Sequence, residues 1–274
     1  MAIIIFNQVT GSGFRKEQGI LGNKNKKFKY HYYKPVSGDG SGRGRKKYEE
    51  FYDNAWEEGL KKGVSGYGDL EMSRLFFDKL DIEKNSSVLE IGCGIGSFLS
   101  SIYNDGYNNI VGIDISKYAV EFGKRNTSYL DLRRMDANTL KFSENFFDIC
   151  FSFDLVEHLK NIDGHFRCVR KILKEGGRYL FQTPNKISNV PVSIIRDRNL
   201  ISWKVYHPSL QYSWSLKKHL LGAGFKDIKF IKIPPLSKYK IQQVPKFLRW
   251  AFKIIPWRSL PLFLQTNFFV VACK

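Results

Sequence analysis

The stretch at residues 88–100, "VLEIGCGIGSFLS", constrains the fold more than any other part of the chain. Glycines at alternating positions stand there between a short apolar run and a helical pattern. A chain that reverses at the carboxyl end of a strand needs positive φ angles and a backbone close to its ligand, and glycine meets both needs. The stretch therefore predicts a strand, a tight ligand-binding turn and a helix.

Strand and helix patterns alternate downstream of this turn. The predicted strands are residues 87–91, 109–113, 130–135, 146–151 and 178–182, and the helices between them are 97–104, 117–125 and 154–173. Such alternation is typical of a doubly wound α/β sheet that is mostly parallel and Rossmann-like. A helix at 216–221 and extended runs at 226–233 and 267–272 predict an antiparallel hairpin that closes a seven-stranded sheet.

Two details of the glycine turn indicate which ligand it binds. The dinucleotide fingerprint GxGxxG would place glycine where this chain has Ser97, so the spacing is GxGxG instead. Glu90 stands two residues before the first glycine, and its carboxylate suits a positively charged ligand such as the amino group and sulfonium of S-adenosylmethionine (SAM). Asp114 ends the second strand about 20 residues on, where a carboxylate accepts from both ribose hydroxyls. A helix N-cap is the alternative for Asp114, with Ser116 competing for that role.

The matching segments extend well beyond the turn. The stretches "GIDISKYAVEFGKRN", "RRMDANTLKFSENFFDICFSFDLVEHL" and "VRKILKEGGRYLFQTPNK" follow the turn in order. Together with the turn they resemble the class I SAM-dependent methyltransferases, from about residue 88 to 232 and again over the last strand. The resemblance implies a methyltransferase fold, SAM as cofactor and methyl transfer as the activity.

The resemblance also implies residue roles in SAM binding. It assigns the methionine part and backbone of SAM to Gly92, Cys93, Gly94 and Gly96. It assigns the ribose to Asp114, and the adenine to Ile115, Asp136 and Ala137. Phe153 matches a position that lines the methionine end. Without the family pattern, Asp136 is a strand-end acid that more often caps a turn.

Three polar residues follow the fourth predicted strand and are the candidates for catalysis. Asp154, Glu157 and His158 stand at i, i+3 and i+4 of the predicted helix, which would place them on one face toward the cleft. The cluster resembles the E-x-x-E-H of quinone-ring O-methyltransferases, where those residues are linked to a divalent metal, but Asp154 is one methylene shorter. Three interpretations stay open: His158 as acid or base, a metal site, and a structural pair. We predict catalytic roles without a metal ion.

Two further residues are expected to contact the methyl acceptor. Asn185 follows the fifth strand and His207 lies in "VYHPSLQY". No N-P-P-Y or D-P-P-Y sequence follows the fourth strand, which argues against the amino-group methylases that act on DNA bases or protein glutamine.

Charge and composition divide the chain into three parts. Residues 1–47 are predicted to be a flexible basic arm, and residues 48–274 the methyltransferase domain with a basic amphipathic insertion at 234–264. The insertion suits a bilayer interface, while a packed lid helix is the alternative. No window approaches the roughly 18 apolar residues of a spanning helix. Four isolated cysteines indicate a reducing compartment, so we expect a cytoplasmic protein, with the insertion favouring the inner membrane surface.

The net charge of +18 calls for an anionic partner or a solvated excess. The preferred hypothesis is a SAM-dependent methyltransferase acting on a small molecule, at a hydroxyl oxygen of a quinone-like, lipid-linked or sugar acceptor, with peripheral contact to an anionic membrane. The alternatives are an RNA methyltransferase, which the charge favours, and a non-catalytic module that binds SAM or a membrane.

Overall fold

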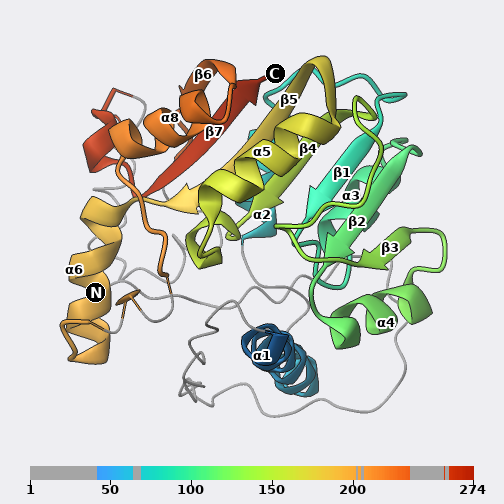
Figure 1. The fold of residues 1–274 in the computed structure, drawn as a ribbon, viewed down its shortest axis with the longest axis horizontal. Coiled ribbons are helices and arrows are strands. Elements are labelled where there is room, and N and C mark those ends of the chain that lie inside the picture. The colour runs from blue at the N-terminus through green and yellow to red at the C-terminus, as the bar shows by residue number, and fades with distance from the viewer. Residues whose placement is uncertain (1–41, 64–68, 202, 205–206, 235–255, 257–258) are drawn as a thin grey trace.

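A seven-stranded sheet forms the centre of the computed structural model, which describes residues 42–63, 69–201, 203–204, 207–234, 256 and 259–274. The strands run in the order β3-β2-β1-β4-β5-β7-β6 (Figure 1). Their bounds are β1 Val88–Ile91, β2 Ile110–Asp114, β3 Asp131–Arg134, β4 Phe147–Phe153, β5 Leu173–Pro184, β6 Lys226–Ile231 and β7 Asn267–Cys273. β7 is antiparallel to both β5 and β6, whereas β1 to β5 pair in parallel. The predicted fold is confirmed.

Helices cover both faces of the sheet, as a doubly wound topology requires. On one face, α5 (Ile162–Ile172) and α8 (Ser213–Gly222) bury Phe166, Val169 and Leu216 against strand residues such as Phe181. On the other, α2 (Leu70–Phe77), α3 (Ser97–Tyr103) and α4 (Lys117–Asn126) pack on strand residues such as Phe151. The central strands β1, β2 and β4 are buried on both sides, which explains their continuous apolar runs, whereas the edge strands β3 and β6 are largely exposed.

Local capping explains where several helices begin. The side chain of Ser116 accepts a hydrogen bond from the Ala119 N–H at the start of α4, as the sequence predicted. Asp69 accepts in the same way from the Met72 N–H at the start of α2. α6 (Lys186–Asp197), which we did not predict, is capped by Asn185 and contains Pro191.

The long helix predicted at residues 154–173 is wrong. Asp154 has a φ of 47°, the turn that follows is the short 3-10 helix η1 (Val156–His158), and α5 begins only at Ile162. Gln182 on β5 fixes Asp154 outside a helix, because its side chain accepts from the Asp154 N–H (3.0 Å) and donates to the Asp154 carboxylate (2.9 Å). Asn161 then supplies a side-chain cap for α5 through the Gly164 N–H.

The predicted flexible basic arm and the predicted basic amphipathic insertion lie mostly outside the described residues. This holds for residues 1–41 of the arm and for 235–255, 257 and 258 of the insertion. Residues 42–47, the end of the predicted arm, belong to helix α1 (Gly42–Lys61). Among the helices in the described ranges, none is long and apolar enough to cross a membrane.

A buried histidine links the third strand's exit loop to the core. The His165 ring donates from Nδ1 to the Ala137 carbonyl (2.8 Å) and accepts at Nε2 from the Tyr179 hydroxyl (2.9 Å), which lies 2.7 Å from the Ser152 hydroxyl. Burial lowers the pKa of His165 to about 4. The ring is therefore neutral near pH 7, in agreement with the one donor and one acceptor that it uses.

This histidine should make the fold sensitive to acid. The unfolded chain takes up a proton at His165 from about pH 6.5, whereas the folded chain takes it up only near 4. Stability from this group is thus full above pH 6.5 and is lost as the pH falls toward 4, by about 3 kcal/mol. Urea unfolding of wild type and His165→Gln across this pH range measures it. The raised pKa of buried Glu90 and Glu157 acts in the opposite direction but is common to both proteins. An equal loss of stability in the two proteins would contradict the assignment.

Candidate cofactor and acceptor site

The glycine turn after β1 has the geometry that the sequence predicted. Gly92, Gly94 and Gly96 have φ angles of 81°, 55° and 82°. The N–H groups of Gly92 and Cys93 both donate to the Ile113 carbonyl at the end of β2 (2.8 and 2.9 Å), and Gly96 begins α3. The turn is therefore fixed between the first two strands at the carboxyl edge of the sheet, and Cys93, Gly94 and Gly96 are buried there.

Trp56 of α1 lies directly over this turn. A Cβ atom built at Gly94 would stand 2.2 Å from the indole ring, so only glycine fits beneath it. Trp56 is 6% exposed. The close approach of α1 is therefore a second reason for glycine at position 94, in addition to the positive φ angle.

We expect Gly94→Ala to destabilise the protein more than Gly106→Ala does. Both glycines have positive φ, but a Cβ at Gly106 meets nothing within 4 Å. The control therefore carries only the backbone strain of about 1 kcal/mol, and Gly94→Ala adds about 1–3 kcal/mol because the Trp56 ring must move. Chemical denaturation of both variants measures the difference. Equal losses would show that Trp56 does not pack against the turn in solution.

Asp114 stands at the end of β2, beside the turn. One carboxylate oxygen accepts from the Gly94 N–H and the other from the Ser116 N–H, both at 2.8 Å. Burial raises the pKa of Asp114, and these backbone donors oppose the shift. Since a carboxylate offers about four acceptor sites, two remain for hydroxyl donors of a ligand. Ser116 and not Asp114 is the N-cap of α4, so the N-cap alternative for Asp114 is wrong, and its ribose contact stays a prediction.

Glu90 is the buried carboxylate that the sequence associated with a cationic ligand. It is 5% exposed, and its Oε2 atom has no hydrogen-bond partner among the described residues. Burial, together with the nearby charge of Asp114, raises the pKa of Glu90 well above its usual value. A cation beside these two acids would favour their charged forms. The carboxylates of Glu90 and Asp114 therefore fit SAM, whose amino group and sulfonium carry positive charge.

A cavity of about 210 Å³ opens next to these acids. Its walls are Ile115, Asp136, Met135, Glu49 and Arg134. Two of these, Ile115 and Asp136, are residues that the resemblance assigned to adenine. Asp136 also accepts from the Asn138 N–H at 2.8 Å, so it caps its turn as well. The next residue, Ala137, is held from behind by His165.

Helix α1 closes the cavity and the turn from outside the sheet, and lies below the strands in Figure 1. Asp53 accepts from the Ser116 hydroxyl (2.6 Å) and the Tyr118 N–H (2.9 Å) at the start of α4. Glu49 pairs with Arg134 across the cavity (2.5 Å). The Tyr48 hydroxyl donates to the His158 carbonyl (3.1 Å). One helix is thus tied to both the cofactor side and the acceptor side.

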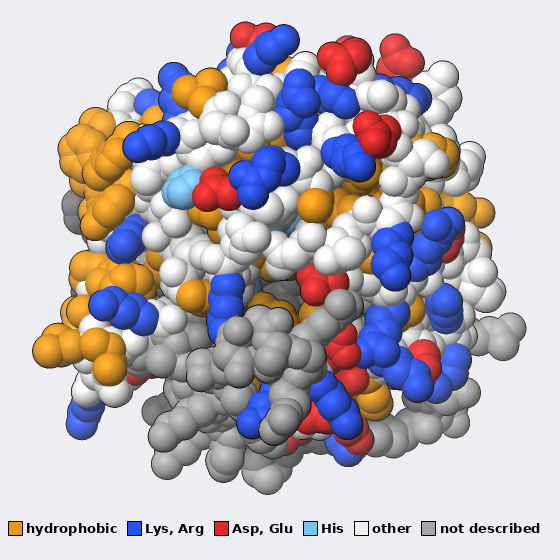
Figure 2. All heavy atoms as spheres, in the orientation of Figure 1, with side chains coloured by type: hydrophobic (Ala, Val, Ile, Leu, Met, Phe, Trp, Pro, Cys, Tyr) orange, Lys and Arg blue, Asp and Glu red, His pale blue; other side chains and the backbone are white. Residues whose placement is uncertain are grey.

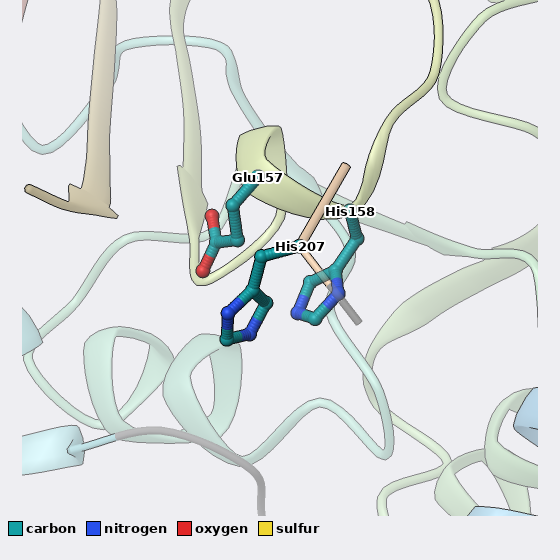
Figure 3. Close-up of side chains that lie close together, drawn as sticks. All are labelled: Glu157, His158 and His207. Carbon is teal, nitrogen blue, oxygen red and sulfur yellow. The ribbon is translucent and has the colours of Figure 1, made fainter. Parts of the chain in front are cut away.

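The acceptor side brings together Glu157, His158 and His207 (Figure 3). The rings of His158 and His207 lie edge to face, with centroids 4.9 Å apart. Each residue of the three offers one ligand atom within 4.8 Å of the others, a spacing that can also hold a metal ion. The third member of this cluster is thus His207, whereas the sequence predicted Asp154 as the third residue beside Glu157 and His158.

The predicted trio of Asp154, Glu157 and His158 does not share a helix face. The Glu157 side chain is 1% exposed and accepts from the Thr183 hydroxyl at 2.9 Å. Burial and the neighbouring Asp154 raise the pKa of Glu157 well above its usual value. The Glu157 carboxyl is thus buried and already bonded to Thr183, whereas the His158 ring is only half-buried and is the group of the trio best placed to take a proton.

Two tyrosines of α1 complete the acceptor side, and the sequence did not identify them. The Tyr52 ring stands edge-on to His158 (centroids 6.5 Å apart), and its hydroxyl lies 3.2 Å from that of Tyr48. Burial raises the pKa of both phenols, so both stay protonated. The signal in the sequence is an aromatic residue at every fourth position, Tyr48, Tyr52 and Trp56.

The remaining predicted residues have mixed placements. Asn185 is fully buried and donates to the carbonyls of Leu262, Phe263 and Gln265, which disfavours the substrate contact predicted for it. Phe153 packs edge-on to Phe76 and beside Phe98, and its role at the methionine end stays a prediction.

The glycine turn, the acids on the first two strands and the strand order are those of a nucleotide-binding α/β domain. Residues 89–181 match the family model of the methyltransferase domain. The chain therefore contains a methyltransferase domain in its central part, and it has the fold of solved SAM-dependent methyltransferases.

Known proteins similar to the chain differ in what they are named for. Phosphoethanolamine N-methyltransferase 1 of Triticum aestivum is 27% identical over 67% of this chain and 39% of its own length. Sterol 24-C-methyltransferase of Kluyveromyces lactis is 26% identical over 63% of this chain and 54% of its own length. A solved structure of Haemonchus contortus phosphoethanolamine N-methyltransferase 2, with phosphomonomethylethanolamine and S-adenosylhomocysteine, has a TM-score of 0.60 at 19% identity. It covers 85% of this chain and 60% of that one. The chain thus matches only about two fifths of the wheat protein's length.

Proposed function

We propose that the chain transfers the methyl group of SAM to a hydroxyl oxygen of a small molecule that is quinone-like, lipid-linked or a sugar. The observation that carries this proposal is the imidazole of His158, which lies next to His207 and under Tyr52 at the carboxyl end of β4. Methyl transfer to a hydroxyl needs a group that takes the hydroxyl proton. Among the acidic and imidazole groups gathered there, His158 suits that task best.

The site geometry supports the following roles for the cofactor residues. Asp114 would accept from the ribose hydroxyls, Glu90 would face the cationic end, and Ile115 and Asp136 would border the adenine in their cavity. SAM supplies an activated methyl group on sulfur. The glycine turn would meet the backbone of the methionine part, with Gly92, Cys93, Gly94 and Gly96 in contact and Phe153 at its end.

The acceptor residues would position the hydroxyl for in-line displacement, in which an oxygen–carbon bond forms as the sulfur–carbon bond breaks. The hydroxyl proton passes to His158. His207 would hold the acceptor and orient the His158 ring, while Glu157 and Asp154 form the buried acidic pair behind it. The cofactor and acceptor sides adjoin along α1, because Glu49 of this helix lines the cavity and its Tyr48 hydroxyl donates to the His158 carbonyl.

An assay with tritiated-methyl SAM tests the proposal. The protein is incubated with fractionated lipids, RNA and small molecules, and with phosphoethanolamine because two similar proteins are named for it. Label in a quinol, lipid or sugar fraction is the expected result. Label in RNA, with a steep loss on adding salt, would favour the RNA methyltransferase alternative. SAM binding by calorimetry without label in any fraction would favour the non-catalytic module.

A further inference from the structure

An apolar surface surrounds α6 at one edge of the molecule. Its side chains are Ile195, Leu200 and Ile201, which are 73%, 74% and 60% exposed, and Trp214, Phe263 and Leu264, which are about half exposed or more. We call these six residues the α6 surface. Figure 2 shows hydrophobic side chains with lysines and arginines among them along this left-hand edge, where Figure 1 places α6 and α8.

The α6 surface is held together as one unit. α6 packs against the 3-10 helix η2 (Leu262–Leu264), and Asn185 at the start of α6 donates to the carbonyls of Leu262 and Phe263. The Lys186 ammonium lies 5.1 Å from the ring centres of Trp203 and Tyr212. Tyr212 in turn stacks on Trp214, with centroids 4.6 Å apart. Lys186 therefore connects α6 to the aromatic residues before α8.

The charges around this surface are almost all positive. Between residues 185 and 222 the sequence has six lysines and arginines and a single acid, Asp197. Arg198 and Lys204 are exposed beside Leu200 and Ile201, and Lys217 and Lys218 are exposed on α8. Exposed aliphatic side chains within a basic rim are the pattern of a helix that lies in an anionic bilayer interface.

We propose that the α6 surface docks the protein on an anionic lipid bilayer. Aliphatic side chains exposed to this degree have no use in RNA binding, which relies on aromatic stacking and phosphate contacts. A second copy of the chain is also a poor partner, because a two-fold interface would place the same positive rim against itself. A bilayer accepts both features, since its acyl region takes the aliphatic groups and its anionic headgroups take the lysines and arginines.

The docked orientation would bring the acceptor side close to the lipid. α6 follows directly from the carboxyl end of β5, and His207 lies in the segment between Trp203 and α8. Only this step rests on the proposed function, and it favours the lipid-linked acceptor among the three classes. The docking itself does not depend on methyl transfer.

Sedimentation of the full chain with lipid vesicles tests the docking. The protein should bind vesicles that contain phosphatidylcholine and phosphatidylglycerol. Its affinity for vesicles of pure phosphatidylcholine should be lower by about tenfold or more, as expected for the loss of several contacts between basic side chains and anionic headgroups. Leu200→Asp with Ile201→Asp should lower binding by about tenfold or more. The double variant Arg198→Gln with Lys204→Gln removes two exposed positive charges. It should lower vesicle binding by roughly fivefold per charge.

Leu75→Asp is the matched control, because Leu75 is a 40% exposed leucine on α2, away from α6. It should bind vesicles as the wild type does. SAM calorimetry on every variant tests folding and the cofactor site separately from docking. The proposal is overturned if binding ignores lipid charge, or if Leu75→Asp loses as much as the α6 variants. It is equally overturned if the α6 variants only dissolve a dimer, or if they weaken RNA binding while vesicle binding is unchanged.

Discussion

Replacing His158 by alanine is expected to lower kcat for methyl transfer by about 100- to 10,000-fold, the range for loss of a general base. The dissociation constant for SAM should stay within about twofold, because the hydrogen bond that α1 makes to residue 158 uses the main-chain carbonyl, which alanine keeps. The tritium assay with the acceptor fraction that takes label gives kcat, and calorimetry gives the affinity for SAM.

His219→Ala is the control for this change. His219 bonds to Asp163 at the surface, at 2.7 Å, on a helix far along the chain from β4. Its loss should leave kcat unchanged. If His158→Ala also leaves kcat unchanged, the imidazole is not the base, and the acceptor either is already deprotonated or attacks the methyl group through an atom that has no proton to lose.

Replacing Asp114 by alanine is expected to raise the dissociation constant for SAM by about 100-fold. Two hydrogen bonds from ribose hydroxyls to a buried carboxylate are together worth about 3 kcal/mol, which corresponds to that factor. The same change leaves the Gly94 and Ser116 N–H groups without their acceptor, so the fold should also lose about 1–3 kcal/mol.

Asp114→Asn separates these two effects. The amide keeps one acceptor oxygen, so one of the Gly94 and Ser116 N–H groups keeps its partner, and we expect a loss of about tenfold in SAM affinity with a smaller loss of stability than in Asp114→Ala. Isothermal calorimetry and urea unfolding measure both quantities on the same samples. Undiminished SAM binding by Asp114→Ala would contradict the ribose contact, whatever the stability does.

The fold was predictable because its signals are local. The glycine turn, the apolar runs of β1, β2 and β4, and the caps at Asp69 and Ser116 each depend on a few neighbouring residues. The break after Asp154 was not, because the side chain that fixes it, Gln182, lies 28 residues away on another strand. A helical pattern alone does not reveal such a competing contact.

The candidate site was predictable on the cofactor side and only in part on the acceptor side. Glu90 and Asp114 sit at strand ends, so their convergence follows from the topology. The approach of His207 to His158 depends instead on how the segment after β5 folds back. The role of Tyr52 depends on where α1 docks, and that docking rests on Asp53 and Glu49, whose bonds with α4 and β3 join segments more than 60 residues apart.

Helix α1 touches the cofactor turn through Trp56 and the acceptor side through Tyr48. A single motion of this helix therefore has to admit both reactants and free both products. The cofactor side and the acceptor side then open together, so the demethylated cofactor and the methylated product should be released in the same opening of the site. The rate at which α1 moves away from the site would then set the upper limit on kcat, whichever acceptor is methylated.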